Sequence, residues 1–164
     1  MKKRNALTAP ARLLTLLAAT VLAPNLYASN AAAQGSLAIR ELGPPGSAIP
    51  VLSWSWGSRN SGSFHGGGGG GAGKANFQDL TFTKLFDRNT PSILHFVATG
   101  DHFENVVLRW GPATIAMTKV LVTSYEVDSE KMQEKITLNF VKVDVMAQDA
   151  SMTFCWDVAE NTRC

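Results

Sequence analysis

A run of glycines between two segments of alternating sequence constrains this chain more than any other feature. Residues 66–73 read GGGGGGAG. Six consecutive glycines have no side chains with which to form a helix or a core, so they predict a surface loop. The flanking segments, Ile49–Trp56 and Asn76–Phe86, alternate with the period of two that is typical of β-strands. We therefore expect two strands joined by this loop.

The same loop partly matches a phosphate-binding motif. Gly68–Lys74 supplies the first seven positions of G-x-x-x-x-G-K-[ST], but Ala75 stands where the motif needs a hydroxyl for Mg²⁺. The sequence that follows predicts a strand, so no helix N-terminus would face a phosphate. The pattern therefore argues against a nucleotide site.

The rest of the chain predicts further strands and one short helix. In the helix, Thr90 is expected to be the N-cap, Pro91 the first helical residue and Gly100 the C′ residue. A phase change in the apolar pattern of the longest strand, between Phe140 and Val141, predicts a β-bulge. The additional strands are expected at Ser36–Leu42, Glu104–Trp110, Ala113–Val127, Lys135–Ala147 and Met152–Val158, with a charged turn at Asp128–Glu134.

These elements predict a mainly-β fold. The strands lie close together in the sequence and are joined by turns, which favours antiparallel pairing. Closing the sheet removes exposed edges, so we expect an antiparallel β-barrel with one short flanking α-helix rather than a flat sheet.

The first 33 residues have the pattern of a cleaved secretory signal peptide. Residues 2–4 are basic, residues 13–22 form an apolar run, and small-residue cleavage sites end at Ala28 and at Ala33. The apolar run is too short to span a membrane. The sequence therefore predicts a mature domain of residues 34–164 that is secreted or periplasmic and has no membrane association after cleavage.

The basic excess of the chain belongs to this N-terminal segment. The full chain has 15 Lys and Arg against 13 Asp and Glu. Four of the basic residues precede residue 34, so 11 basic and 13 acidic residues remain and the net charge of residues 34–164 is −2. The sequence contains no basic patch interleaved with aromatic residues, which argues against a nucleic-acid partner.

The sequence offers little support for catalysis, a metal or a cofactor. His65, His95 and His102 lack the spacing of a metal site. Asp101 and Glu104 form a carboxylate pair of a kind that more often belongs to a solvated turn, and no nucleophile motif accompanies them. We predict no catalytic residue, no metal and no cofactor.

Two residue pairs leave alternatives open. Cys155 and Cys164 are separated by eight residues, so an exported chain could bridge them, or Cys155 could be buried and Cys164 free. Trp54 and Trp56 point to the same side of a strand. They are expected in the core or at a subunit interface, and a stacking platform for sugar rings or bases is the alternative.

Seven segments, taken in order, carry a resemblance to a known family. They are SWSWG (53–57), GGGGGAGK (67–74), FQDLTFTK (77–84), TPSILHFVATGDH (90–102), VLVTSYEV (120–127), KITLNFVKVDV (135–145) and FCWDVAEN (154–161). Together they resemble the Hcp family, the tube proteins of bacterial type VI secretion, over most of residues 49–161.

The resemblance implies a non-catalytic β-barrel subunit without a cofactor. It implies self-assembly into a six-membered ring, stacking of rings into a hollow tube, and the type VI spike, sheath and small effectors as further partners. Function would then lie in subunit contacts. The residues of the matching stretch that we expect at contacts are Trp54, Trp56, Lys74, Phe77, Asp79, Phe82 and Lys84.

The sequence thus favours a type VI secretion tube subunit or an exported relative of one. A periplasmic or extracellular module that binds glycan through exposed tryptophans is a second hypothesis. A secreted effector or hydrolase that uses Asp101 or His102 is a third.

Overall fold

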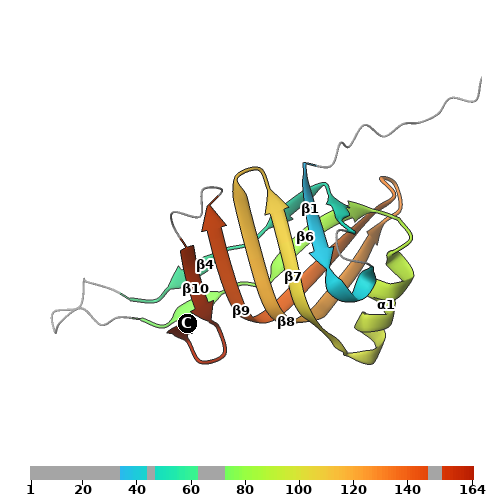
Figure 1. Cartoon of the computed structure of the whole chain (residues 1–164). Helices are drawn as coiled ribbons and strands as arrows, with labels where there is room; N and C mark the ends of the chain where they lie inside the picture. The colour runs from blue at the N-terminus through green and yellow to red at the C-terminus, as the bar shows by residue number, and fades with distance from the viewer. Residues whose placement is uncertain (1–33, 44–46, 63–72, 148–152) are drawn as a thin grey trace, which may run out of the picture.

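Antiparallel strands form most of the chain that the computed structural model describes, which is residues 34–43, 47–62, 73–147 and 153–164 (Figure 1). These residues form one sheet of nine strands and one of two. The elements are β1 (Gly35–Ile39), the 3₁₀ helix η1 (Arg40–Leu42), β2 (Ile49–Val51), β3 (Ser53–Ser55), β4 (Ser58–Asn60), β5 (Ala75–Phe77), β6 (Leu80–Leu85), α1 (Thr90–Thr99), β7 (His102–Trp110), β8 (Ala113–Asp128), β9 (Gln133–Ala147), β10 (Thr153–Asp157) and β11 (Thr162–Arg163).

The long strand β9 joins the parts of the larger sheet. β8 pairs with it from one end to the other. β6 pairs with residues 133–138 of β9, and β10 pairs with residues 142–146. From β8 the sheet continues through β7 and β1 to β2, while β3 extends it beyond β6. The sheet therefore curls around a single core (Figure 1).

The predicted mainly-β, antiparallel fold with one short helix is confirmed, but the barrel is not closed. The segment that was expected to be one strand, Ile49–Trp56, is broken at Leu52. Within the described residues, β2 pairs with β1 and β3 pairs with β6, so neither has a ladder on both edges. The break occurs because the apolar pattern changes phase: Val51 and Trp54 both pack on the core, and the Leu52 N–H donates to the Thr83 carbonyl at 2.8 Å.

Two other predicted strands are interrupted, and the strands predicted to begin at Glu104 and Lys135 begin two residues earlier, at His102 and Gln133. Asn76–Phe86 is divided into β5 and β6, and β5 pairs with β4 in a two-stranded ribbon that the sequence did not predict. Ser36–Leu42 ends in the 3₁₀ helix η1. The glycines at 66–71, His65, the proposed signal peptide and Met152 lie outside the described residues.

The buried face of the sheet changes its side-chain phase along one line that crosses β7, β8 and β9. The register places the three changes side by side, and Lys119 on this line has a positive φ of 51°. The phase change expected in β9 is therefore present, but the register shift lies in β8, where Thr123 is the extra residue. Successive buried residues across the change are Phe103 and Val106, Met117 and Val120, and Phe140 and Val143.

Helix α1 packs on the sheet through its apolar stripe. Ile93 is buried, and the Phe96 ring lies 4.1 Å from the Phe103 ring, centroid to centroid. Gly100 ends the helix in the left-handed conformation expected of a C′ glycine, with φ 72°. Thr90 is the first helical residue rather than the N-cap, because its hydroxyl instead accepts hydrogen bonds from the Asp87 N–H and from Lys84.

None of the helices in the described part of the chain has the length and apolarity that crossing a membrane requires.

The core is almost entirely aliphatic and aromatic. The buried apolar residues are Leu37, Ile39, Ile49, Val51, Leu80, Phe82, Ile93, Phe103, Val106, Leu108, Ile115, Met117, Val120, Val122, Ile136, Leu138, Phe140 and Val143.

Candidate functional surfaces

The seven predicted contact residues differ widely in exposure. Phe82 and Lys84 are 1% and 0% exposed, so neither side chain reaches the surface of the subunit. They belong to the interior and are left out of any contact surface. Of the others, Lys74 is exposed, and Trp54, Trp56, Phe77 and Asp79 are half-buried.

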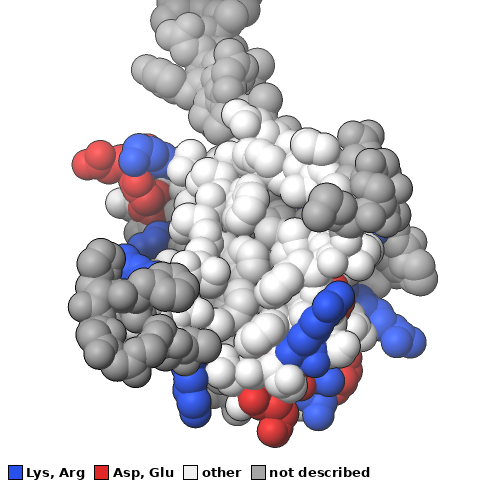
Figure 2. Space-filling view, turned by 90° about the vertical axis from the view of Figure 1, so that its left-hand side faces the viewer, with Lys and Arg blue, Asp and Glu red and all other residues white. Residues whose placement is uncertain are grey.

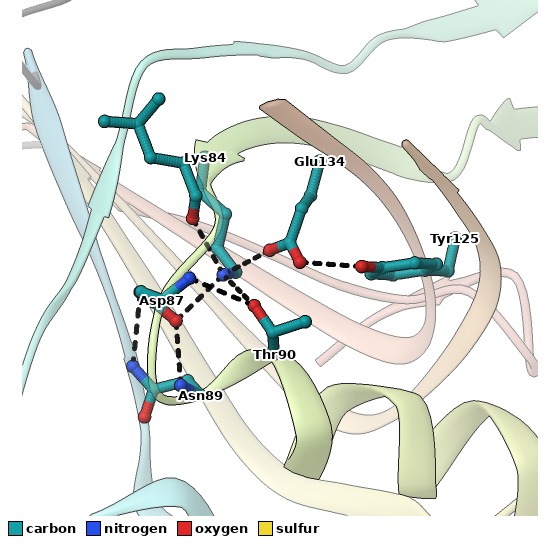
Figure 3. A network of polar contacts seen from close by, with 7 residues as sticks. Lys84, Asp87, Asn89, Thr90, Tyr125 and Glu134 are labelled. Carbon is teal, nitrogen blue, oxygen red and sulfur yellow. Dashed lines mark hydrogen bonds and ion pairs between the residues drawn. The ribbon is translucent and has the colours of Figure 1, made fainter. Parts of the chain in front are cut away.

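Lys84 is the centre of a buried polar network (Figure 3). Its Nζ pairs with the carboxylate of Glu134, which is also 0% exposed, and with Asp87 at 2.9 Å. It also donates to the Thr90 hydroxyl at 3.1 Å and to the Leu85 carbonyl at 3.0 Å. The network therefore ties the end of β6 to the start of α1 and to β9.

Tyr125 completes the network on the β8 side. Its hydroxyl donates to Glu134 Oε1 at 2.6 Å. Burial and this carboxylate raise the pKa of Tyr125 far above its ordinary value, so the phenol stays protonated and remains a donor. Burial acts to raise the pKa of Asp87, but hydrogen bonds from Lys84 and Asn89 outweigh it and lower the pKa overall.

Asp79 stabilises the sheet at its bulge. Its carboxylate accepts hydrogen bonds from Thr123 Oγ1 at 3.1 Å and from Asn139 Nδ2 at 2.8 Å. Thr123 is the extra residue of β8, and Asn139 lies on β9. Asp79 therefore links the turn between β5 and β6 to the irregular part of the sheet.

The two tryptophans of the first predicted strand have different neighbours. Trp54 packs edge-on against Trp110, with centroids 6.5 Å apart. Trp56 stacks on Phe77 at 5.9 Å, and Phe77 in turn lies about as close to Phe154 and Trp156, at 6.2 and 6.0 Å. Trp56 is thus part of an aromatic cluster that joins the β4–β5 ribbon to β10.

Two grooves adjoin this aromatic cluster. One, of about 550 Å³, lies between the ribbon and β10 and is lined by Trp56, Phe77, Phe154, Trp156 and Val145 together with Ser58, Arg59, Asn60 and Ala75. The other, of about 750 Å³, is lined by polar residues of the ribbon, including Arg59 and Lys74. Figure 2 shows the end of the molecule that carries β4 and β10, where a broad uncharged centre is bordered by charged side chains.

A disulfide holds the C-terminal hairpin at this end. Cys155 on β10 and Cys164 are bonded, with their Cα atoms 5.5 Å apart. The β10–β11 ladder has two residue pairs, Trp156 with Arg163 and Asp157 with Thr162. The bond therefore constrains a hairpin whose backbone pairing is short.

The histidines and carboxylates considered for catalysis lie on the surface. His102 Nε2 is 3.0 Å from Glu104 Oε1, and both side chains are more than half exposed. Asp101 and His95 are also exposed. Among the described residues, no group of three or more His, Cys, Asp or Glu could hold a metal ion.

The fold and these surfaces define a small, curled antiparallel β-domain with one flanking helix. The chain belongs to the Hcp family: the family model described as "Type VI secretion system effector, Hcp" matches residues 46–146. It is accordingly a structural protein of the type VI secretion tube.

Relatives of known sequence and structure agree with this placement. Protein hcp1 of Pseudomonas aeruginosa is 36% identical over 137 residues, which is 70% of this chain and 85% of that protein. The crystal structure of Hcp1 from Salmonella typhimurium has 23% identity and a TM-score of 0.62, over 79% of this chain and 97% of that one. A structure of a type six secretion system protein has 19% identity and a TM-score of 0.67, over 79% and 98%. The two structures support the fold alone.

Several residues that shape the surfaces were not singled out from the sequence. Glu134 was placed in a charged turn, although it begins a buried alternation that continues with Ile136 and Leu138. Lys84 was singled out, but as a contact residue. It has the same signal of burial, because it follows Leu80 and Phe82 at the strand period. Phe154, Trp156 and Arg59 could not be linked, because only the fold brings β4 and β10 together.

Proposed function

We propose that residues 34–164 form a non-catalytic subunit that assembles into a six-membered ring, and that the rings stack into a type VI secretion tube. The observation that carries this proposal is the family match, which extends from just before β2 to the end of β9 and so spans most of the strands of the curled sheet. The spike, the sheath and small effectors in the lumen are the further partners of such a tube.

Contacts between subunits are proposed to use the predicted residues that remain accessible. These lie along the segments that lead into and out of the ribbon, and the buried Phe82 lies opposite Trp54 in the β3–β6 ladder. These side chains are only half-buried or exposed in the isolated subunit, and a large, obligate subunit contact would bury them further. The accessible candidates are Trp54, Trp56, Lys74, Phe77 and Asp79.

We further propose that the chain is exported through a cleaved signal peptide of residues 1–33. The basic, apolar and small-residue pattern of that segment supports this route. The bond between Cys155 and Cys164 also supports it, because disulfides persist in oxidising compartments such as the periplasm. The mature protein would then be secreted or periplasmic.

Electron microscopy of the purified protein tests the ring. Class averages should show particles with sixfold symmetry and a central opening. Lys131→Met removes an exposed ion pair with Asp128, far from the ribbon. This variant is the control and should leave the class averages unchanged. Particles without rotational symmetry at every protein concentration would refute the ring. The mass of the N-terminal peptide from protein recovered outside the cytoplasm tests the signal independently, since an intact Met1 would exclude cleavage.

A further inference from the structure

We infer that the two grooves of the β4–β5 ribbon together bind an extended acidic peptide segment that carries one apolar side chain. The aromatic groove would hold the apolar side chain, and the basic groove would hold the carboxylates. This site goes beyond ring formation, because all of its lining comes from one subunit. It shares Trp56, Lys74 and Phe77 with the proposed subunit contacts, so a peptide would compete with a neighbouring subunit for this surface.

The aromatic groove has the size and lining of an apolar binding site. Its volume of about 550 Å³ falls within the range of roughly 300–1,000 Å³ that is usual for ligand pockets. Phe154 at its rim is 43% exposed, which is high for a phenylalanine packed beside two other aromatic rings. An apolar side chain placed there would cover this ring and remove apolar surface from water.

Two indole N–H groups beside the groove lack acceptors. Nε1 of Trp56 and Nε1 of Trp156 are buried and have no hydrogen-bond partner in the structure. A buried donor without an acceptor is costly. Both rings line the groove, so a backbone carbonyl of a bound peptide that reached either N–H would supply the missing acceptor, which an apolar small molecule could not offer.

The second groove supplies positive charge without compensating acids. It is lined by Arg59 and Lys74 among amides and small residues. Of the residues that the structure describes, no Asp or Glu lines either groove. Charge complementarity therefore favours an anionic ligand, and carboxylates suit the planar guanidinium of Arg59.

The two grooves meet on one ribbon, so a single ligand can occupy both. They share Arg59, Asn60 and Ala75, and the ribbon register places Asn60 opposite Ala75. An extended peptide rises about 3.3 Å per residue, so acids two to four residues from the apolar side chain would reach the basic groove. This spacing defines the expected ligand.

A peptide fits the site better than a nucleic acid. Bases bind by stacking on free aromatic faces, whereas Trp56 is already stacked on Phe77, and Phe154 lies parallel to Trp156. Two cations are also few for a backbone of phosphates, and residues 34–164 carry a net charge of −2.

Fluorescence anisotropy with labelled peptides tests the site on protein purified after expression of the full chain. The probe is a ten-residue peptide with one central Phe and Asp or Glu on both sides. Peptides with Lys in place of the acids, or Ser in place of Phe, and a single-stranded oligothymidine are the comparisons. We expect the acidic Phe peptide to bind at least about tenfold more tightly than each of them.

Variants locate the binding. Arg59→Glu and Phe154→Ala should each weaken binding of the acidic peptide about tenfold, while Lys131→Glu, another charge change at an exposed position, should leave it unchanged. Equal affinity for the Lys peptide, tighter binding of the oligonucleotide, or no effect of Arg59→Glu would overturn the inference. The particle mass measured on the same samples separates this result from the ring. Because a subunit contact through Trp56, Lys74 and Phe77 would cover the site, the peptide should bind the unassembled subunit most tightly.

Discussion

The two ends of the molecule are held together by different chemistry. At the end beside α1, a buried network of Lys84, Glu134 and Asp87 joins β6, β9 and the helix. At the other end, which Figure 1 shows on the opposite side of the molecule from α1, aromatic rings join the β4–β5 ribbon to β10, and the Cys155–Cys164 disulfide ties β10 to the C-terminal residue. Charged contacts between buried groups therefore hold the first end, whereas ring packing and one covalent bond hold the second.

The difference arises because buried ion pairs depend more strongly on distance and angle than aromatic contacts do. A buried charge must meet its partner at one distance and angle, because a buried charge without a partner is strongly destabilising. The network therefore fixes how β6 lies against β9. Aromatic contacts accept a range of ring positions. An end built from them can accept a ligand while the fold remains intact.

The largest effect is expected from breaking the charged end. Lys84→Met leaves the Glu134 carboxylate buried without its cation, which should lower the free energy of unfolding by about 3–5 kcal/mol. Urea unfolding at matched protein concentration measures this loss. Lys131→Met, which removes an exposed pair with Asp128, is the control and should cost less than about 1 kcal/mol.

A double variant sharpens this test. Lys84→Met with Glu134→Leu removes both charges and should recover most of the stability that Lys84→Met loses. Similar losses for Lys84→Met and Lys131→Met would show that the network does not hold this end.

A smaller loss is expected at the disulfide end. Replacing both cysteines by serine releases a loop of about ten residues, which should lower the free energy of unfolding by about 2–3 kcal/mol. Reductant should shift the urea midpoint of the unmodified protein toward that of the double variant and leave the double variant unaffected. A urea midpoint of the unmodified protein that is the same with and without reductant would contradict this account.

Tyr125→Phe weakens the charged end without removing a charge. The variant keeps the ring but takes away the donor to Glu134 Oε1, and we expect a loss of about 1–2 kcal/mol. Urea unfolding measures it. In the Lys84→Met, Glu134→Leu background the same change should cost much less, and equal costs in both backgrounds would show that the hydroxyl acts independently of the network.

Acid should act on both ends through carboxylates with lowered pKa values. The Glu160 N–H lowers the pKa of Asp157, burial opposes this, and Lys142 adds to the lowering. Because the folded pKa lies below the unfolded one, the stabilisation is present above about pH 4 and is lost as pH falls through the folded pKa. Asp157→Asn keeps an acceptor for the N–H, so it should reduce the loss of stability between pH 5 and pH 3. Equal losses in both proteins would contradict this assignment.

The sequence predicted most of the fold because its strands repeat with a clear period. Helix α1 and the strands from β7 to β9 have apolar periodicities that are visible within each segment, so they can be predicted without knowing the neighbouring elements. The barrel closure failed at Leu52, where a phase change inside one apolar segment divides it between two neighbours. Such a break depends on which residues lie across the core, and the local sequence pattern carries no information about them.

The candidate surfaces were less predictable for the same reason. Trp56 was expected in the core or at a contact, and the structure places it half-buried beside a groove whose other wall comes from β10, about one hundred residues later in the chain. Lys84 was expected at a subunit contact because it lies in the stretch that resembles the Hcp family, and the structure buries it instead. Its partner Glu134 lies fifty residues away, so their pairing could not be predicted from either segment alone.

The most direct test of the central claim is the solution mass of the protein by light scattering after size exclusion. We predict a particle of about six subunits that persists on dilution, since the family match assigns the chain to the type VI secretion tube. A monomer at every concentration would contradict the ring and leave a curled β-domain whose function lies in the grooves of its β4–β5 ribbon.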